Sequence, residues 1–319
     1  MEKVVESGVP ADVLVDEALL RRLLSGQFPQ WADRGLRRVE SSGTDNAIFQ
    51  LGDDLAVRLP RVEWAAGQPE KEHRWLSSLA PWLPLPVPVP LALGKAAEGY
   101  PWPWSVCPWL KGEAVSLDRI DDEGRLAGDL AGFLAALHRT DAAGGPSPGA
   151  HNFYRGVALA RRDSRTRAAI AAIAGLLDAD ALTAGWEAAL AAPPWEGPGV
   201  WIHGDLQAGN LLCVQGRLSS VIDFGGLGVG DPACDLIVAW NLLTAQGRAV
   251  FRSALEVDDA TWARGRGWAL STALIALPFY LESNSAVARN ARRTIDEVLA
   301  EQPRERVSGV FGRLDSQSR

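Results

Sequence analysis

The sequence predicts an α+β protein with a small β-rich N-terminal lobe and a larger, mainly helical C-terminal lobe. The chain has 319 residues, of which 47% are hydrophobic and 22% are charged. This composition is typical of globular proteins that bury an ample apolar core. Short apolar segments between turn residues mark the early part of the chain, whereas helical spacing of apolar residues dominates from residue 121 onward. At roughly 100 to 200 residues per domain, the length fits one large domain or two lobes.

Strands are expected near the start of the chain. Residues 39–59 contain short apolar segments that are interrupted by Ser, Gly, Thr, Asp and Asn at residues 41–46 and by Gly and Asp at residues 52–54. These residue types favour turns because they tolerate unusual backbone angles or bond to their own backbone. The first part of the chain is therefore predicted to be β-rich.

A helix and an extended segment are expected to follow these strands. Residues 69–79 carry apolar side chains at helical spacing, with Glu70 and Glu72 in the first turn, where the helix dipole favours acids. Five prolines lie between Pro81 and Pro90. Proline lacks the N–H that a helix interior needs, so this segment is expected to run extended.

Helices are expected to dominate the rest of the chain. An amphipathic helix is indicated by apolar residues at i, i+4, i+7, i+8 and i+11: Leu126, Leu130, Phe133, Leu134 and Leu137. Three short apolar segments are expected to be strands, at residues 200–202, 211–214 and 218–222. We place the boundary between the lobes near residues 108–112, which divides the chain into 1–108 and 109–319.

Charge and composition argue against several classes of function. The formal charge is −7 and no basic stripe is visible, so a nucleic acid partner is not expected. The longest apolar run, Trp268–Leu281, is interrupted by Pro278 and is shorter than the roughly 20 residues of a spanning helix. We expect a core helix there and no membrane partner. The first 20 residues lack the pattern of a secretory signal, and the three Cys and four His form no zinc pattern. A reducing, cytoplasmic location is therefore expected.

The densest cluster of polar residues lies at residues 203–210 and continues at Asp223. If the chain between Asn210 and Asp223 folds back at Gly216, these two residues reach the same level on neighbouring strands, about 5 Å apart. A carboxylate and an amide oxygen suit Mg²⁺, which completes its octahedron with water and phosphate oxygens. Asp205, in the preceding loop, can accept a proton from a substrate hydroxyl as general base. Together the three residues describe a phosphoryl-transfer site.

The alternative interpretation is that Asp205, Asn210 and Asp223 are only turn and cap residues, which is a common role of Asp and Asn in loops. Each of them alone fits that role well. Turn formation does not require all three at a spacing that a hairpin brings together, so the chemical interpretation is preferred.

Neighbouring polar residues are expected to support this cluster. His203 follows a short apolar strand and is interpreted as a buried hydrogen-bonding residue that holds the loop. Asp231 precedes Pro232 in the pattern of an N-cap with proline at the first helical position. Asp235 lies one turn further on, where it is either a surface acid favoured by the helix dipole or a brace for the catalytic loop.

These motifs resemble the aminoglycoside phosphotransferases and their relatives, which share the protein-kinase-like two-lobed fold. Residues 203–210 match the H-G-D-x-x-x-x-N signature of that family, and residues 222–225 match its counterpart of the kinase D-F-G. The resemblance implies that residues 1–108 form a nucleotide-binding lobe and that residues 109–319 form the catalytic and substrate-binding lobe.

The resemblance also implies a role for each of these residues. It makes Asp205 the catalytic base, Asn210 and Asp223 the Mg²⁺ ligands, and Asp235 an anchor for the loop. These roles agree with the interpretation from the residues themselves.

In the small lobe, the resemblance implies a loop over the phosphates, a basic residue on the third strand and an acid on the next helix. Ser42, Gly43 and Thr44 resemble the loop. Arg58 stands on the strand where protein kinases have lysine, and an arginine can pair with phosphate through two donors. Glu72 is the candidate acidic partner of Arg58; the alternative is a helix acid without a partner.

Residues 105–109 resemble the hinge between the lobes that receives the nucleobase through backbone groups. Pro108 supplies no N–H there. Cys107 and Trp109 remain the candidate contacts for the nucleobase.

The chain contains 13 tryptophans, an unusual number. Core packing is the expected role of those in the larger lobe, because large aromatic side chains dominate interior area. Stacking on a sugar or a cation is the alternative. The residues concerned are Trp201, Trp240, Trp262 and Trp268.

Taken together, the sequence predicts a Mg²⁺-dependent O-phosphotransferase that moves the γ-phosphoryl group of ATP or GTP to a hydroxyl of a small molecule. The resemblance favours an aminoglycoside or a similar antibiotic as acceptor. The alternatives are a kinase of a macrolide or a primary metabolite, and a nucleotide-binding module without turnover. A protein kinase ranks last because no activation segment is recognisable between Gly225 and Asp231. The oligomeric state is left open.

Overall fold

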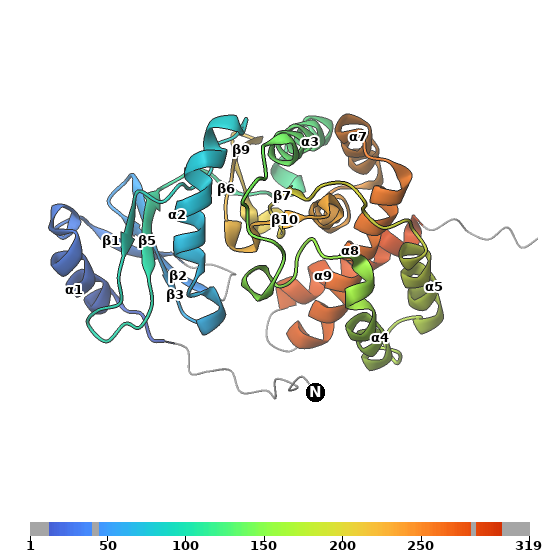
Figure 1. Ribbon diagram of the computed structural model, residues 1–319, viewed down its shortest axis with the longest axis horizontal. Coiled ribbons are helices and arrows are strands. Elements are labelled where there is room, and N and C mark those ends of the chain that lie inside the picture. The colour runs from blue at the N-terminus through green and yellow to red at the C-terminus, as the bar shows by residue number, and fades with distance from the viewer. Residues whose placement is uncertain (1–12, 40–44, 282–284, 302–319) are drawn as a thin grey trace, which may run out of the picture.

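The N-terminal part is a five-stranded antiparallel sheet flanked by two helices. The computed structural model describes residues 13–39, 45–281 and 285–301. The sheet has the order β1-β2-β3-β5-β4, and Figure 1 shows α1 on its outer side and α2 between the sheet and the rest of the chain. The elements are α1 (Glu17–Gln27), β1 (Leu36–Val39), β2 (Asn46–Leu51), β3 (Leu55–Pro60), α2 (Gln68–Leu79), β4 (Ala92–Gly94) and β5 (Trp104–Pro108).

The C-terminal part is mainly helical and includes two small antiparallel sheets (Figure 1). Strand β10 pairs with β7, and β8 lies between β6 and β9. The strands are β6 (Glu113–Ala114), β7 (Val200–Ile202), β8 (Leu211–Val214), β9 (Arg217–Val221) and β10 (Gly228–Gly230). The helices are α3 (Glu123–Arg139), α4 (Asp163–Ala172), α5 (Ala179–Leu190), α6 (Val238–Asn241), α7 (Ala245–Leu255), α8 (Asp259–Tyr280) and α9 (Ser285–Ala300).

Short 3-10 turns join many of these elements. Those that matter for the site lie at Ala150–Asn152, Leu159–Arg162, Ala208–Asn210, Phe224–Gly226 and Pro232–Ile237.

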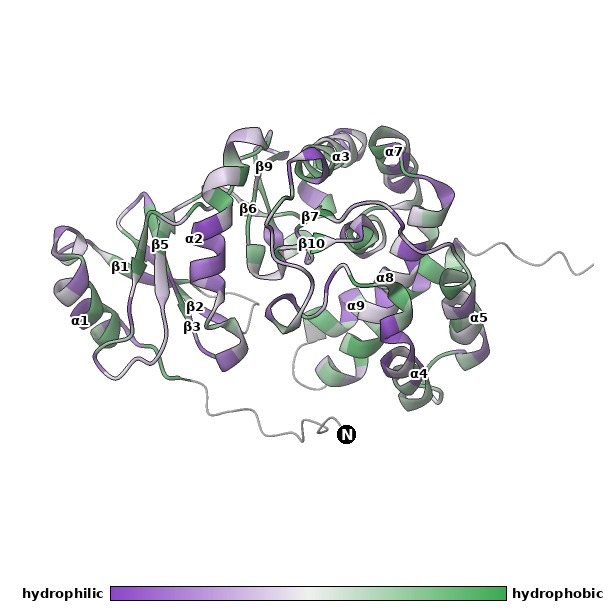
Figure 2. Ribbon diagram, viewed as in Figure 1, coloured by the Kyte–Doolittle hydropathy of each residue, from purple (hydrophilic) through white to green (hydrophobic). Residues whose placement is uncertain are grey.

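Apolar burial explains why these segments fold as they do. Strand β2 alternates between half-buried and buried positions, so that Ala47, Phe49 and Leu51 enter one core. On α1, Leu20 and Leu24 are buried at i, i+4 spacing in the same core. Figure 2 shows the apolar side of α1 turned toward the sheet.

A second and larger core forms among the C-terminal helices, with α3 and α8 as major contributors. This core also takes in Leu76 and Leu79 of α2 and Val87 from the proline-rich segment. Helix α2 thus joins the larger core, although it precedes the expected boundary near residue 108. Within the part of the chain that the structure describes, no helix is long and apolar enough to cross a membrane.

The α+β organisation predicted from the sequence is confirmed. The helix expected at 69–79 is α2, and the amphipathic pattern of Leu126 to Leu137 lies within α3. After a 3-10 turn at Ala80–Trp82, the proline-rich segment forms no regular element before Ala92. The apolar run from residue 268 lies in α8, whose last turn is less buried than expected because Phe279 is exposed.

Candidate active site

The predicted hairpin brings Asn210 and Asp223 to its open end. Leu211 of β8 pairs with Val221 of β9, and the backbone N–H of Ile222 donates to the carbonyl of Asn210 at 2.9 Å. Asn210 therefore faces Ile222 across the ladder, and Asp223 follows one residue later rather than at the same level as expected. Asp223 has a left-handed backbone with φ of 64°, a conformation that Asp tolerates better than most residues.

Asp205 lies against Asn210. The side-chain nitrogen of Asn210 donates to the carbonyl of Asp205 at 2.8 Å and to its carboxylate at 3.2 Å. These bonds orient the amide, so that its oxygen points away from Asp205 and is available to a cation. The side chain of Asp205 is 41% exposed, as a group that receives a substrate must be.

Asp235 holds the loop that carries Asp205 through hydrogen bonds to its backbone. The buried carboxylate of Asp235 accepts the backbone N–H of His203 at 3.0 Å and that of Gly204 at 2.7 Å. His138 on α3 contacts the same carboxylate at 3.2 Å. The prediction that Asp235 is a brace rather than a surface acid is confirmed.

His203 is a buried hydrogen-bonding residue, as predicted. Its Nε2 lies 3.1 Å from the carbonyl of Ile222, and its Nδ1 accepts the backbone N–H of Asp205 at 3.2 Å. This pattern corresponds to the neutral tautomer with the proton on Nε2. The ring therefore links the loop of Asp205 to the strand that precedes Asp223.

Asp231 is an N-cap, as predicted, and it has a second partner. Its carboxylate accepts the backbone N–H of Ala233 at 2.9 Å and pairs with the buried Arg264 of α8 at 2.8 Å. The helix that it caps is a 3-10 turn at Pro232–Ile237, which precedes α6.

Arg58 joins the sheet to α2 and to the hairpin. Its guanidinium donates to Glu72 at 2.6 Å and to Asp223 at 3.1 Å. The expected partnership with Glu72 is present, and both side chains are buried. Burial raises the pKa of Glu72 although Arg58 opposes that change. One carboxylate oxygen of Glu72 has no partner among the described residues.

Lys71 is a cation beside the site that sequence reasoning missed. Its ammonium donates to the carbonyl of Gly225 at 2.6 Å and to that of His151 at 3.0 Å. Burial lowers its pKa from 10.5 to about 8, against the opposing effect of Glu72 and Asp223. The only signal in the sequence is its position next to Glu72, which does not reveal the contact with Gly225.

The candidate nucleobase contacts lie at the end of β5. Cys107 is buried opposite Ala56, and its thiol lies 3.7 Å from the hydroxyl of Ser105. Burial raises the pKa of this thiol to about 11. The backbone N–H of Trp109 donates to the carbonyl of Asp54 at 2.7 Å, so this N–H is engaged within the protein. The candidate phosphate loop, residues 42–44, lies outside the described residues.

The donor set at the hairpin fits Mg²⁺. Asp223 offers a partly exposed carboxylate and Asn210 an amide oxygen, which matches the one or two protein ligands that Mg²⁺ takes beside phosphates and water. Among the described residues, no group of three or more His, Cys, Asp or Glu side chains gathers as a metal site would. A cage made of protein ligands alone is therefore not formed by that part of the chain.

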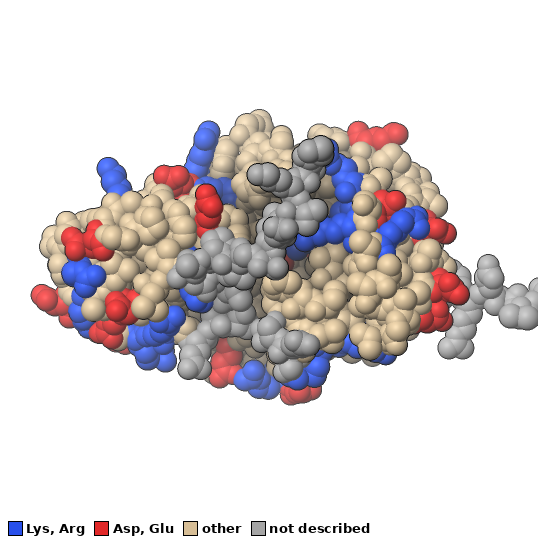
Figure 3. Space-filling view, turned by 90° about the horizontal axis from the view of Figure 1, so that it is seen from below, with Lys and Arg blue, Asp and Glu red and all other residues tan. Residues whose placement is uncertain are grey.

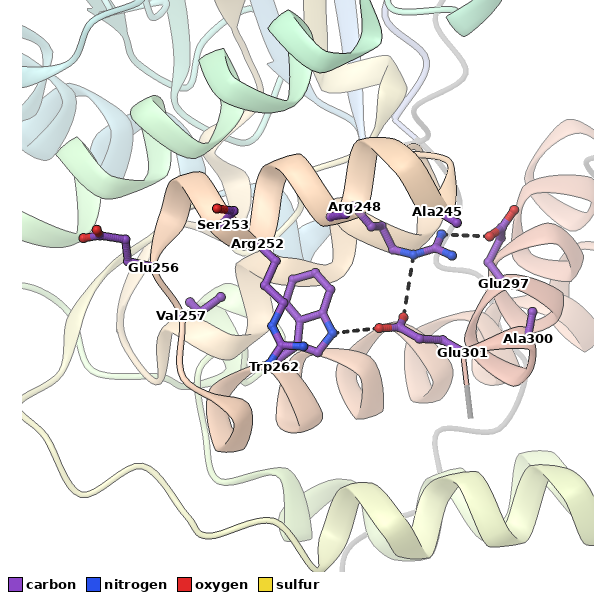
Figure 4. A pocket seen from close by; sticks show the side chains of 11 residues that line it. Ala245, Arg248, Arg252, Ser253, Glu256, Val257, Trp262, Glu297, Ala300 and Glu301 are labelled. Carbon is purple, nitrogen blue, oxygen red and sulfur yellow. Dashed lines mark hydrogen bonds and ion pairs between the residues drawn. The ribbon is translucent and has the colours of Figure 1, made fainter. Parts of the chain in front are cut away.

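A cavity of about 850 Å³ lies elsewhere, between α7, α8 and α9. In Figure 4, Arg248 points toward Glu297 and Glu301, and Trp262 donates to Glu301. Arg248, Glu297 and Glu301 of this cavity thus pair with one another, and none of the candidate site residues lines it.

The comparisons with known proteins agree with this geometry. A sequence model of the phosphotransferase enzyme family matches residues 36–268. The chain belongs to this family. As a member of the phosphotransferase enzyme family, it is an enzyme, and the alternative of a binding module without turnover is not supported.

Individual relatives of this phosphotransferase include enzymes that are named for antibiotics. An aminoglycoside 3'-phosphotransferase of Escherichia coli is 41% identical over 58 residues, a segment that spans 18% of this chain and 21% of that relative. The GDP complex of aminoglycoside 2'-phosphotransferase-IIIa superimposes with a TM-score of 0.72 and 19% identity, covering 90% of this chain and 99% of the other. The macrolide 2'-phosphotransferase of Brachybacterium faecium superimposes with a TM-score of 0.55 and 24% identity, covering 89% of this chain and 100% of the other. These structures confirm the two-lobed kinase-like fold of this phosphotransferase.

Proposed function

We propose that this phosphotransferase moves the γ-phosphoryl group of a nucleoside triphosphate to a hydroxyl of a small molecule, with Mg²⁺ as cofactor. The observation that carries the proposal is the convergence of Asp205, Asn210 and Asp223. Asn210 donates to Asp205 at 3.2 Å, and its carbonyl accepts the backbone N–H of Ile222, the residue before Asp223. A base and two oxygen ligands at one place are what phosphoryl transfer requires.

Each of these residues has a task that its surroundings support. Asp205 accepts the acceptor's hydroxyl proton as the oxygen bonds to the γ-phosphorus and the bond to the β-phosphate oxygen breaks, which releases the nucleoside diphosphate. Asn210 and Asp223 would hold Mg²⁺, whose charge offsets that of the phosphates. Arg58 bridges Glu72 and Asp223, so it is held where it can orient the nucleotide phosphates.

The small lobe completes the proposed nucleotide site. Ser42, Gly43 and Thr44 would cover the phosphates, and Cys107 and Trp109 lie at the hinge where the nucleobase would bind. Related structures are complexes with GDP and with ADP, so both ATP and GTP are candidate donors. The boundary between the nucleotide-binding and catalytic lobes is proposed near residue 108, and the enzyme is proposed to act in the cytoplasm, where both donors are present.

The acceptor class is a separate proposal. Likeness to aminoglycoside and macrolide phosphotransferases makes these antibiotics the first acceptors to test, with primary metabolites as the alternative. One related structure contains kanamycin and GDP. The side chains around Asp205 bear on this choice and are considered below.

The test is mass spectrometry of candidate acceptors incubated with ATP or GTP and Mg²⁺. We expect one acceptor to gain a single phosphoryl group, and we expect EDTA to abolish the gain. Asp205→Asn should lower kcat by about 10²- to 10⁴-fold while nucleotide affinity stays within about threefold, because only proton acceptance is lost. Asp129→Asn, an exposed residue of α3, is the matched control. Full activity of Asp205→Asn would refute the proposal.

A further inference from the structure

An arginine, Arg155, lies next to Asp205 on the side of the helical part. Arg155 approaches the carboxylate of Asp205 at 3.7 Å and donates to the hydroxyl of Thr272 on α8 at 3.1 Å. Its side chain is only 13% exposed, so it is held in place rather than free in solvent. Figure 3 shows Lys and Arg side chains gathered beside the hollow of the helical part.

Arg162 adds a second cation that lacks an acidic partner. Its guanidinium donates to Ser271 at 2.9 Å and stacks on Trp268, with its carbon 4.6 Å from the ring centroid. Among the described residues, no carboxylate pairs with it. Burial, together with the nearby charges of Arg155 and Arg165, lowers the pKa of Arg162 to about 9. The protein thus keeps a desolvated positive charge next to two others, which is costly unless something negative binds there.

Trp268 provides an independent sign that a hydrogen-bond acceptor binds here. The ring is fully buried, and both Arg155 and Arg162 lie against it, at 5.9 and 4.6 Å from its centroid. Its indole N–H has no hydrogen-bond partner among the described residues. Buried donors are normally paired, so an unpaired N–H on a ring that both arginines contact points to a bound group that accepts hydrogen bonds.

The carboxylates of the surrounding elements are already engaged. Asp163 of α4 accepts from Arg167 at 2.9 Å and from the indole of Trp186 at 2.7 Å. Asp231 pairs with Arg264, and Asp235 accepts the loop amides. None of these acids is left to neutralise Arg162.

We propose that the acceptor of this phosphotransferase carries an anionic group, a carboxylate or a phosphate, which Arg155 and Arg162 bind next to the hydroxyl at Asp205. This inference rests on the proposed function and adds the charge of the substrate. The guanidinium groups match the two oxygens of such a group, with charge-assisted hydrogen bonds. A polycationic aminoglycoside would instead bring ammonium groups toward Arg162, which has no acidic partner among the described residues. An anionic metabolite therefore fits this side of the site better.

Sulfate is a probe for this subsite. The protein is first saturated with Mg²⁺ and ADP, which occupies the nucleotide phosphate positions, and sulfate is then titrated by calorimetry. We expect sulfate to bind the wild type and to bind Arg162→Gln at least about tenfold more weakly. Arg167→Gln, an exposed arginine of the neighbouring α4, should keep the wild-type affinity. Equal affinity in all three proteins, or no binding to the wild type, overturns the inference.

Acceptor pairs that differ only in charge distinguish the two sources of the anion. Glucuronate is compared with glucuronamide, and glucose 6-phosphate with glucose, as acceptors of a phosphoryl group. Faster transfer to the anion of a pair supports the inference and identifies carboxylate or phosphate. Equal or faster transfer to the neutral partner overturns it. Arg162→Gln should raise the KM of the anion and leave kcat nearly unchanged.

The outcomes separate this inference from the proposed function. Transfer to a neutral or cationic acceptor that depends on Asp205, combined with no sulfate binding, would refute the anionic subsite alone. Asp205→Asn that transfers as well as the wild type would refute the proposed function, whatever sulfate does. Unfolding by urea checks that Arg162→Gln folds, and we expect only a small change in stability, because removal of the unpaired charge offsets the lost contacts with Ser271 and Trp268.

Discussion

The carboxylate of Asp235 accepts the backbone N–H of Gly204, 31 residues earlier in the chain, at 2.7 Å. It accepts the neighbouring N–H of His203 at 3.0 Å with its other oxygen. The position of Asp205 therefore depends on a carboxylate that does not face the acceptor. Four predictions follow from contacts of this kind.

Asp235→Asn should lower kcat by about tenfold or more with little change in the KM of the nucleotide. An amide has one acceptor oxygen, so one of the two loop N–H groups loses its partner and meets an NH₂ group instead. Leaving a buried donor unsatisfied costs about 1–3 kcal/mol of unfolding free energy. Steady-state kinetics and urea denaturation measure both effects, with Asp129→Asn as control. A variant with normal kcat would show that the brace is dispensable.

Arg58→Met should destabilise the fold by about 3–5 kcal/mol, because it leaves the buried carboxylate of Glu72 without its partner. The double variant Arg58→Met/Glu72→Met should recover most of this loss, since no buried charge then remains. Both variants should bind the nucleotide more weakly than the wild type, because both lack Arg58. Urea denaturation and nucleotide titration test the two statements separately. A double variant no more stable than Arg58→Met would contradict the interpretation.

Lys71 should make stability depend on pH in the alkaline range. The folded protein lowers the pKa of Lys71 from 10.5 to about 8 by burial, so between these pH values the unfolded chain binds the extra proton. Stability then rises with pH, by up to about 1.4 kcal/mol per pH unit, and Lys71→Met lacks this rise. Urea midpoints from pH 7 to 10 give the difference between the two proteins. If the difference in urea midpoint between the wild type and Lys71→Met stays constant from pH 8 to 10, Lys71 does not titrate in this range.

Gly204→Ala should destabilise the protein by more than about 1 kcal/mol and reduce transfer. Gly204 has φ of 81°, and a Cβ there would lie 2.5 Å from the carbonyl oxygen of Gly226. Gly128→Ala in α3 is the matched control, since a Cβ at Gly128 meets nothing within 4 Å. Alanine there should stabilise the helix by about 0.5–1 kcal/mol. Thermal unfolding of both variants checks the contrast.

The hairpin and its polar residues could be predicted because the information is local. Gly216 marks the turn and the apolar segments on either side form the strands, but the register places Asn210 opposite Ile222, one residue before Asp223. The partnership of Arg58 with Glu72 was also expected, through the family resemblance rather than from spacing. The buried packing of Trp268 in the core was expected as well.

The remaining contacts depend on how distant segments pack, which periodicity does not encode. Lys71 reaches Gly225 only because α2 lies against the turn that follows Asp223. Arg155 and Arg162 come from the segment between α3 and α4 and meet on Trp268 of α8. The sequence analysis singles out neither arginine. The helix expected after Asp231 is a 3-10 turn, and the pairing of Asp231 with Arg264 of α8 is a further contact between distant segments.

Helix α2 contributes Leu76 and Leu79 to the larger core. The same helix carries Glu72, which pairs with Arg58 of the sheet. A cut of the chain at residue 108 would therefore strip apolar side chains from the C-terminal fragment. The N-terminal half would keep the ion pair of Arg58 with Glu72 but would lose the one with Asp223. Separate expression of the halves would yield two incomplete proteins, and activity would require them to be joined again through this one helix.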